Sequence, residues 1–407
     1  MSEPGHTSLV RDGGEPLVAS LPAEPDNRGR QAYTLRALLG PLGFDPRPTN
    51  ADAGSPVELY WPDRPDRRLA LDPGRLREAF EALSGLREAN VPRDRLGRVA
   101  SAALGIDCSR PALSEWAVEL ADSLAPLNPA WNRPRRRLTV HLTHDVDVVN
   151  PRNPMTLAGM LVRWVRGLAH PGRPRPQDSK LTHWLANAGQ FVETYQAVMD
   201  FERQAGARAT YFFCSGPYSF RRYGSRTGQG RRLRGLIELA ESFDHRVGLH
   251  GCVYSLDRGD YARQMQFIAR HASGPVTWHR NHYLVWDAAR SPSALARAGI
   301  SVDSTCGFHD ANGFRSHLAW PYELWDIPGD APSGVVEIPL IFMDACHDLD
   351  DEQTWAELYD LLARAEAVGG QVAVLFHADL FLGQPERIER YRKWVAFLAD
   401  RGALAAE

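Results

Sequence analysis

The 407-residue chain carries 47 basic and 50 acidic side chains, for a formal net charge of −3, and is 43% hydrophobic and 24% charged. This composition is typical of folded globular proteins and excludes wholesale disorder and fibrous folds. A charge so near zero gives no global attraction to nucleic acid or anionic membranes, and no apolar run approaches the ~20 residues of a membrane span. We therefore expect no nucleic-acid partner and no membrane span.

The N-terminus and the cysteines bear on the compartment. The first 30 residues contain five acidic side chains and no apolar stretch of the kind that an export signal needs, so we expect a cytoplasmic protein. The five cysteines are odd in number, widely spaced and without a Cys-x-x-Cys pair, which argues against a disulfide framework and a thiolate zinc site. No feature of the sequence predicts the oligomeric state.

The N-terminal third is expected to contain a tail and a small domain. Residues 1–29 are polar, rich in Gly, Pro and Glu, and lack periodicity, which is typical of a disordered tail. Residues 30–135 combine a helical pattern after Ala32, a strand-like run at Val57–Trp61, and apolar spacings of three and four between residues 75 and 124. They predict a small α/β domain that ends in helices.

Residues 136–407 alternate short apolar runs with helical patterns. The seven candidate strands are Leu138–Leu142, Ala209–Cys214, Arg246–Leu249, Val276–Trp278, Gly299–Val302, Val335–Ile341 and Gln371–Phe376. The predicted helices are Ala188–Gln204, Arg232–Ser242, Tyr261–His271, Pro292–Ala298, Thr354–Ala367 and Glu386–Ala399. Such alternation favours parallel pairing, in an open doubly wound sheet or a closed β/α barrel, with ligand chemistry at the carboxyl ends of the strands. The proline-rich segment Pro151–Lys180 is expected to be an insertion.

Polar side chains stand at or just past the ends of several of these runs. Asp145 and Asp147 are two residues apart, so they share one face of an extended chain. The others follow later runs and are His250, Arg280, His282 and His377. Each also has a plainer explanation, namely an Asp-x-Asp turn, a structural histidine or a polar loop side chain.

Taken together, carboxylates and histidines at the ends of different strands suit a metal-assisted hydrolase. Asp and His are ordinary zinc ligands, and a bound divalent ion polarises a carbonyl and lowers the pKa of water. Two neighbouring carboxylates repel each other unless a cation or a proton separates them, so one would bind the metal and the other would accept the proton of water. A histidine would give a proton to the leaving atom near neutral pH.

These residues lie in motifs that resemble the polysaccharide deacetylase family, the NodB-type carbohydrate esterases. The resemblance covers about residues 138–400. The matching segments are Leu142–Asp147 for the first motif, Ala209–Phe213 for the Ala-Thr-Phe-Phe strand, Gly248–Gly251 for the metal-histidine motif, Arg280–Tyr283 for Arg-x-Pro-Tyr, and Val374–His377 for the closing Leu-x-His. Several runs resemble a branch associated with exopolysaccharide or secondary-metabolite clusters; they are Arg280–Leu284, Val302–Thr305, Gly313–Arg315, Glu337–Leu340 and Met343-Asp344.

The resemblance implies a fold, a site and an activity. The fold is a distorted barrel of about seven β/α units preceded by a small α/β domain. The implied roles are general base for Asp145, metal ligand for Asp147 and His250, orientation and ionisation of Asp145 by Arg280, general acid for His377, and oxyanion stabilisation by the backbone N–H of Tyr283. The activity is metal-dependent removal of an acetyl group from a sugar or glycosylated metabolite by a hydrolase of C–N bonds other than peptide bonds. Zinc is the expected ion, and other divalent ions remain open.

One position departs from the family pattern. The family has a second metal histidine four residues after His250, where this chain has Tyr254, and a neutral phenol is a poor zinc ligand. His282 takes the place of the family's Pro, so we predict that His282 is the third ligand. We expect Tyr254, Tyr283 and Arg315 to contact the substrate. Arg315 lies in an aromatic segment whose side chains could stack on a sugar or form core.

Three other functions remain open on the sequence alone. The barrel could have lost the chemistry and act as a carbohydrate-binding or pathway-assembly protein, which bound metal would argue against. The run Asp145-Val146-Asp147 could be the metal-nucleotide motif of a glycosyltransferase, although this leaves His250 and His377 without a role. The same centre could also hydrolyse another C–N bond, as in cyclic amides or imides.

Overall fold

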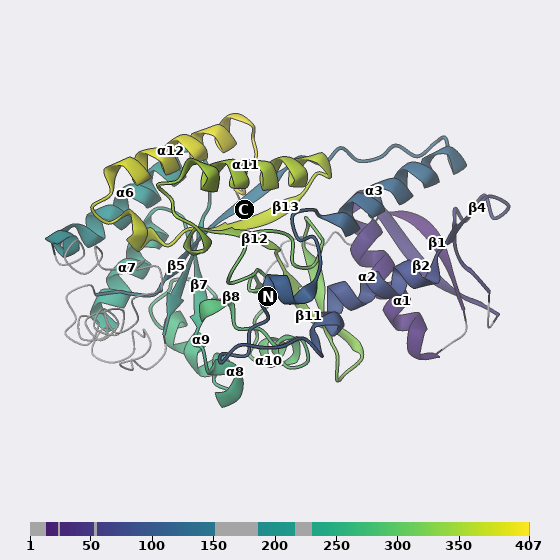
Figure 1. Ribbon diagram of the computed structural model, residues 1–407, viewed down its shortest axis with the longest axis horizontal. Coiled ribbons are helices and arrows are strands. Elements are labelled where there is room, and N and C mark those ends of the chain that lie inside the picture. Colours follow the sequence, from purple (N-terminus) through teal and green to yellow (C-terminus); the bar gives the residue numbers. More distant parts are fainter. Residues whose placement is uncertain (1–13, 23–24, 53–54, 151–185, 216–229, 407) are drawn as a thin grey trace. The chain divides into compact units, whose positions relative to one another are not determined.

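The computed structural model describes residues 14–22, 25–52, 55–150, 186–215 and 230–406. The predicted insertion at Pro151–Lys180 therefore lies outside the described residues. The strands are β1 (Glu15–Pro22), β2 (Phe44–Ala51), β3 (Val57–Tyr60), β4 (Arg68–Leu71), β5 (Thr139–Val146), β6 (Thr210–Cys214), β7 (Arg246–Gly251), β8 (Trp278–Asn281), β9 (Val302–Asp303), β10 (Tyr322–Asp326), β11 (Ala331–Glu337), β12 (Leu340–Met343) and β13 (Gln371–Leu375). The helices are α1 (Pro25–Leu39), α2 (Pro73–Ser84), α3 (Ala112–Leu124), α6 (Phe191–Gln204), α7 (Gly230–Ser242), α8 (Ser255–Arg258), α9 (Tyr261–Ala269), α10 (Ser291–Arg297), α11 (Glu352–Ala367) and α12 (Pro385–Asp400) (Figure 1).

The chain divides into two compact units. Unit 1 comprises residues 1–139, 284–342 and 356–373, and unit 2 comprises residues 140–283, 343–355 and 374–407. Both are mixed α/β, which confirms the predicted class. Unit 1 includes residues from later in the chain, so the sequential scheme of domains at 30–135 and 136–407 stays a prediction, as does the barrel of seven β/α units. None of the described helices combines the length and apolarity needed to cross a bilayer.

Unit 1 contains a four-stranded sheet in the order β2-β1-β3-β4. Strand β1 pairs in parallel with β2 and antiparallel with β3. The expected tail over residues 1–29 is therefore wrong for residues 15–22, and helix α1 already begins at Pro25. Strands β1 and β2 were not predicted because prolines interrupt their sequences. Strand β2 contains Pro46 and Pro48, which are tolerated because β2 is an edge strand.

The sequence signals the start and the end of helix α2 in unit 1. The side chain of Asp72 accepts a hydrogen bond from the backbone N–H of Gly74, and Pro73 begins α2, which is a standard helix start. Gly85 closes the helix at a φ of 74°, a left-handed conformation that favours glycine. The helical spacing predicted around residues 99–104 corresponds only to a short 3₁₀ turn at Ser101–Leu104.

Later residues of unit 1 add the strand order β10-β11-β9. Strand β10 pairs antiparallel with β11, and β11 pairs in parallel with β9. The predicted strand Val335–Ile341 is two strands, because Pro339, which has no backbone N–H to donate, separates β11 from β12. Strand β10 is not among the strands predicted from the sequence.

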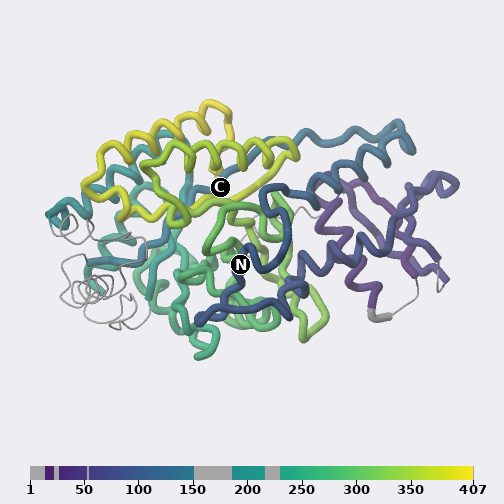
Figure 2. Tube along the Cα trace, viewed as in Figure 1, coloured from purple at the N-terminus to yellow at the C-terminus, as the bar shows by residue number. Residues whose placement is uncertain are grey.

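Unit 2 contains strands β8, β7, β6 and β5, which pair in parallel in that order. Every residue of β6 is buried, as in parallel strands covered on both faces. The predicted helices of this unit match α6, α7, α9 and α12 to within three residues. Helix α6 packs against α12, so the middle of the chain and its C-terminal end lie side by side (Figure 2).

Candidate metal centre and active site

The end of strand β5 supplies two carboxylates to one face. Asp145 lies in β5, and Asp147 directly follows its last residue. Side chains alternate along a strand, so Asp145 and Asp147 point to one side and His144 points to the other. Asp145 is only 3% exposed. A buried carboxylate needs a positive or hydrogen-bonding partner, and other strands of the same sheet supply several.

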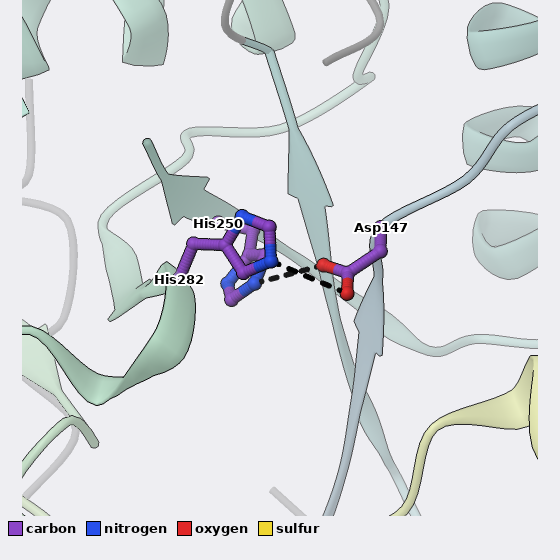
Figure 3. A group of neighbouring side chains, drawn as sticks. All are labelled: Asp147, His250 and His282. Atoms are coloured by element: carbon purple, nitrogen blue, oxygen red, sulfur yellow. Dashed lines mark ion pairs between the residues drawn. The ribbon is translucent and has the colours of Figure 1, made fainter. Parts of the chain in front are cut away.

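Asp147 meets two histidines that come from more distant strands of the same sheet. His250 lies in β7, and His282 directly follows β8. Nε2 of His250 lies 3.1 Å from Oδ1 of Asp147, and Nε2 of His282 lies 3.4 Å from Oδ2 (Figure 3). Across the described residues, this is the one group of three or more His, Cys, Asp or Glu side chains placed to share an ion, with ligand atoms within 4.8 Å of one another. The structure thus brings together the three residues that we predicted as metal ligands.

The geometry of the three residues fits a divalent metal. Two ligands of a tetrahedral zinc ion, each 2.0–2.1 Å from it, lie about 3.3 Å apart, close to the two distances above. Nδ1 of His250 lies 3.0 Å from the carbonyl oxygen of Arg280, which can only accept, so Nδ1 carries a hydrogen, and Nε2 is the atom that would bind a metal once it has lost its own proton. Nε2 of His250 and Oδ1 of Asp147 are buried without an aligned hydrogen bond. Such atoms are costly to bury, and a cation between them would satisfy both.

Mutual electrostatic attraction stabilises the cluster of Asp147, His250 and His282. Burial favours the neutral form of His250, but the carboxylates of Asp145 and Asp147 outweigh it and raise the pKa of His250 to about 9. Burial also disfavours the charged form of Asp147, but His282 and His250 together hold its pKa well below the ordinary value. A metal has to displace the protons held on the histidines, so metal uptake is expected to weaken as the pH falls.

Asp145 stands beside the cluster but is tied to a different partner. Nη1 of Arg280 lies 3.2 Å from Oδ1 of Asp145 and donates to Oγ1 of Thr143 at 2.8 Å. The guanidinium is fully buried and lies over the ring of Phe212, 4.7 Å from its centroid. The other carboxylate oxygen, Oδ2, lies 3.6 Å from Nε2 of His250. One oxygen is thus held by a permanent counter-charge, while the second faces the cluster.

His377 stands just past strand β13 and has a carboxylate partner that the sequence did not reveal. Its Nδ1 lies 2.7 Å from Oδ1 of Asp344, and its backbone N–H donates to Oδ2 at 2.6 Å. Burial lowers the pKa of His377, but Asp344, helped by Asp145 and Asp147, raises it to about 10. The charges of Asp145 and Asp147 therefore also favour the protonated form of His377. Asp344 occurs in a motif of the sequence, yet nothing there indicated which side chain it would contact.

Tyr283 has a backbone conformation that is rare for its residue type. Its φ is 60°, in the left-handed region, where a side chain stores strain that is often found at functional sites. Its ring stacks on the ring of His282, with centroids 4.1 Å apart and planes 7° apart. Tyr254, 39% exposed, precedes α8 and packs its ring against the guanidinium of Arg258. Substrate contact by either tyrosine stays a prediction.

Arg315 is a buried ion-pair residue of unit 1. Its Nε and Nη2 donate to the two carboxylate oxygens of Glu88 at 2.9 and 2.6 Å, and its Nη1 donates to the carbonyl of Gly307 at 2.8 Å. The prediction that Arg315 contacts substrate is wrong, because its donors are used inside the protein. Phe314 and Trp320 are fully buried, so this aromatic segment is core, the plainer of the two explanations.

Comparison with known proteins gives a distant structural likeness. No protein-family model matches the chain, and no curated protein sequence matches it. Among solved structures, the chain is similar to a crystal structure from Mycobacterium smegmatis that is provisionally described as a polysaccharide deacetylase, with 18% identity, coverage of 68% of this chain and 88% of that chain, and a TM-score of 0.45. A likeness this distant carries no argument about activity, so the function has to be inferred from the site itself.

Replacing His282 should weaken metal binding, whereas changing Tyr254 should not. We expect His282→Ala to reduce the affinity for Zn²⁺ by about 100-fold or more. Loss of an outer-shell partner alone costs about 10–100-fold, and loss of a direct ligand should cost at least as much. Tyr254→Phe removes only a hydroxyl and should leave the affinity within a factor of about two. Competition with a chromophoric chelator measures both. The reverse order would return the third-ligand role to Tyr254.

Breaking the Glu88–Arg315 pair should destabilise unit 1 without touching the site. Both side chains are nearly inaccessible, with exposures of 4% and 6%. Removing one partner of such a pair strands a buried charge, so we expect Glu88→Gln to lower the free energy of unfolding by about 3–5 kcal/mol. Urea unfolding measures the loss. Zinc affinity should be unchanged, and a stability change below about 1 kcal/mol would show that the pair contributes little.

Proposed function

We propose that the chain is a metal-dependent hydrolase that removes an acetyl group, bound as an amide or an ester, from a sugar or a glycosylated small molecule. The observation that carries the proposal is the convergence of Asp147, His250 and His282 on one point, with Asp145 beside them but tied to Arg280. One carboxylate and two imidazoles leave part of a zinc coordination sphere open, as catalytic sites require. Zinc suits this donor set best, and another divalent ion would be compatible with it.

The chain's own residues then divide the proton transfers between them. A divalent ion at this position supplies a Lewis acid that polarises a carbonyl oxygen and makes water more acidic. Oδ2 of Asp145 accepts the proton of the attacking water. Arg280 holds the Asp145 carboxylate in its orientation and balances its negative charge. Nδ1 of His377 is engaged by Asp344, so Nε2 is the atom that donates a proton to the leaving nitrogen or oxygen. The backbone N–H of Tyr283 is a proposed oxyanion donor.

The proposal of an acetylated carbohydrate as substrate comes from the motif resemblance. Two exposed tyrosine rings are compatible with it. Tyr254 and Tyr283 are the exposed tyrosine rings nearest in sequence to His250 and His282, with exposures of 39% and 38%. Aromatic rings with a polar tip are suitable surfaces for sugar rings, which have both apolar faces and hydroxyls.

Metal content and acetate release together test the function. We expect the purified wild type to bind about one equivalent of zinc, and Asp147→Ala, which lacks the carboxylate ligand, to lose it. The matched control is Asp360→Ala, an exposed acid on α11. Acetate release is then measured on acetylated chito-oligosaccharides and acetylated xylan.

The outcomes separate the competing functions. Zinc loss confined to Asp147→Ala, with acetate release by the wild type, is the expected result. A zinc-free wild type that binds these sugars without cleaving them would overturn the proposal in favour of a binding protein. A zinc-loaded wild type that opens cyclic imides but releases no acetate would keep the hydrolase and replace the substrate.

A further inference from the structure

A fully buried polar cluster lies on the side of β5 that faces away from the proposed metal centre. His144 extends to that side, and its side chain is completely inaccessible. Its Nδ1 lies 2.9 Å from the carbonyl oxygen of Phe376, and its Nε2 lies 2.7 Å from Oε1 of Glu202 in helix α6. Glu202 also accepts hydrogen bonds from the hydroxyls of Tyr211, at 2.9 Å, and Tyr391, at 2.6 Å. Four elements and the segment after β13 therefore meet at one carboxylate and one imidazole.

Counting hydrogens assigns the charges in this cluster. The carbonyl of Phe376 can only accept, so Nδ1 of His144 carries a hydrogen. Glu202 accepts from two hydroxyls, which favours its ionised form, so Nε2 of His144 carries a hydrogen as well. Burial alone would raise the pKa of Glu202, but the charge of His144 outweighs burial and lowers it. His144 and Glu202 are therefore a buried imidazolium–carboxylate pair.

The other titratable groups around the pair leave this assignment unchanged. His245 donates from Nε2 to the carbonyl of Met199 and accepts the backbone N–H of Ala209 at Nδ1, so it is neutral. Burial accordingly lowers the pKa of His245. Burial and Glu202 hold the pKa values of Tyr211 and Tyr391 well above normal, so both remain hydroxyl donors. Among the described residues at this carboxylate, His144 alone supplies the balancing charge.

Stability alone does not account for such a pair. Two buried charges lose their hydration, and well-packed apolar residues often replace a buried ion pair without loss of stability. The pair instead contributes to the positioning of the surrounding segments, because each hydrogen bond fixes the relative position of two elements. His144 is the residue before Asp145, and Phe376 is the residue before His377. One imidazole thus links the backbone positions that carry the proposed base and the proposed acid.

We propose that His144 and Glu202 are positioning residues that hold the proposed base, Asp145, and the proposed acid, His377, at their working separation. The link runs from Glu202 through the imidazole to the carbonyl of Phe376. Parallel contacts fix the same two segments, since the backbone N–H of Phe376 donates to the carbonyl of Thr143 at 3.0 Å, and Oγ1 of Thr143 donates to the carbonyl of Val374 at 2.6 Å. The roles of Asp145 as base and His377 as acid rest on the proposed function. The contacts of His144 and Glu202 are observed independently of it.

Two variants separate positioning from support of the fold. Glu202→Gln keeps a hydrogen-bonding side chain of the same size, and His144 keeps its Nδ1 bond to Phe376 after losing one proton. The double variant His144→Phe with Glu202→Gln removes the bond to Phe376 without stranding a charge. Glu88→Gln, which breaks a buried pair in unit 1, is the matched control for a loss of stability alone.

The first readout needs no substrate. In the wild type, the Nδ1 proton of His377, held against Asp344, should give a downfield proton NMR signal that is protected from exchange, and its absence in His377→Ala assigns it. We expect Glu202→Gln and Glu88→Gln to keep this signal and the double variant to lose it, with all proteins folded by circular dichroism. A folded double variant that keeps the signal would overturn the proposal.

The second readout uses two acetylated probes. A nitrophenolate leaves without protonation, whereas an amide nitrogen needs a general acid, so a misplaced His377 should affect only the amide. We expect the double variant to lose about 100-fold in kcat on N-acetylated chito-oligosaccharides, the cost of a displacement of about 1 Å, and less than about threefold on 4-nitrophenyl acetate. Equal losses on both probes would mean a structural role and overturn the proposal. If the wild type cleaves neither probe, the proposed function fails, and the NMR signal still decides whether His144 and Glu202 position His377.

Discussion

Asp145→Asn should retain its zinc and lose nearly all turnover. The substitution keeps the shape of the side chain and its contact with Arg280 but removes the only atom proposed to accept the proton of water. General-base catalysis is worth about 10²–10⁴-fold, so we expect kcat to fall by about 10³-fold or more. The ligands Asp147, His250 and His282 are untouched, so zinc should remain at the wild-type stoichiometry, as measured by elemental analysis of the same samples.

The matched control for this change is Asp200→Asn. Asp200 is a partly exposed acid of helix α6 that accepts from Gln204, and its amide should leave both metal and turnover unchanged. If Asp145→Asn lost zinc in proportion to activity, Asp145 would be a ligand, and the proton acceptor would have to be sought elsewhere.

His377→Ala should slow turnover by about 10²–10⁴-fold, the usual contribution of one general acid, with little change in KM. The acid acts while protonated, so wild-type activity should persist below the pKa of His377 and fall as the pH rises through it. Asp344 is the main cause that raises this pKa to about 10 in the metal-free protein. Asp344→Asn should therefore move the alkaline limb of the kcat profile to lower pH.

A surface histidine gives the matched control for the general acid. His271, past the end of α9, packs edge-on against Phe267 at 5.5 Å, and His271→Ala should leave both the rate and the profile unchanged. An unchanged rate in His377→Ala would remove His377 from the mechanism. An alkaline limb that stays in place in Asp344→Asn would assign that limb to another group.

The sequence predicted those parts of the site that are set by local chain geometry. Asp145 and Asp147 share a face because a strand has a period of two, and parallel strands place their carboxyl ends at one edge of a sheet. From this the sequence could indicate that carboxylates and histidines meet at one edge of the sheet, whereas the choice of Asp147, His250 and His282 as ligands came from the motif resemblance. The long helices were also found, since their apolar spacing extends over several turns.

The parts that sequence reading missed depend on contacts between distant segments. Asp344 reaches His377 across 33 positions, and Glu202 reaches His144 across 58, and no local pattern encodes either pairing. Arg315 was misassigned for the same reason, because its partner Glu88 lies 227 positions away. Strand β1 was missed because its short run between prolines resembles a polar tail.

The most direct test of the account is a crystal structure of the zinc-soaked protein, with anomalous scattering used to locate the ion. The account predicts a single strong site in unit 2 with Oδ of Asp147 and Nε2 of His250 and His282 at about 2.0–2.2 Å, and with both oxygens of Asp145 outside that shell. An ion that binds elsewhere, or one that excludes His282 or Asp147 from its ligands, would contradict it.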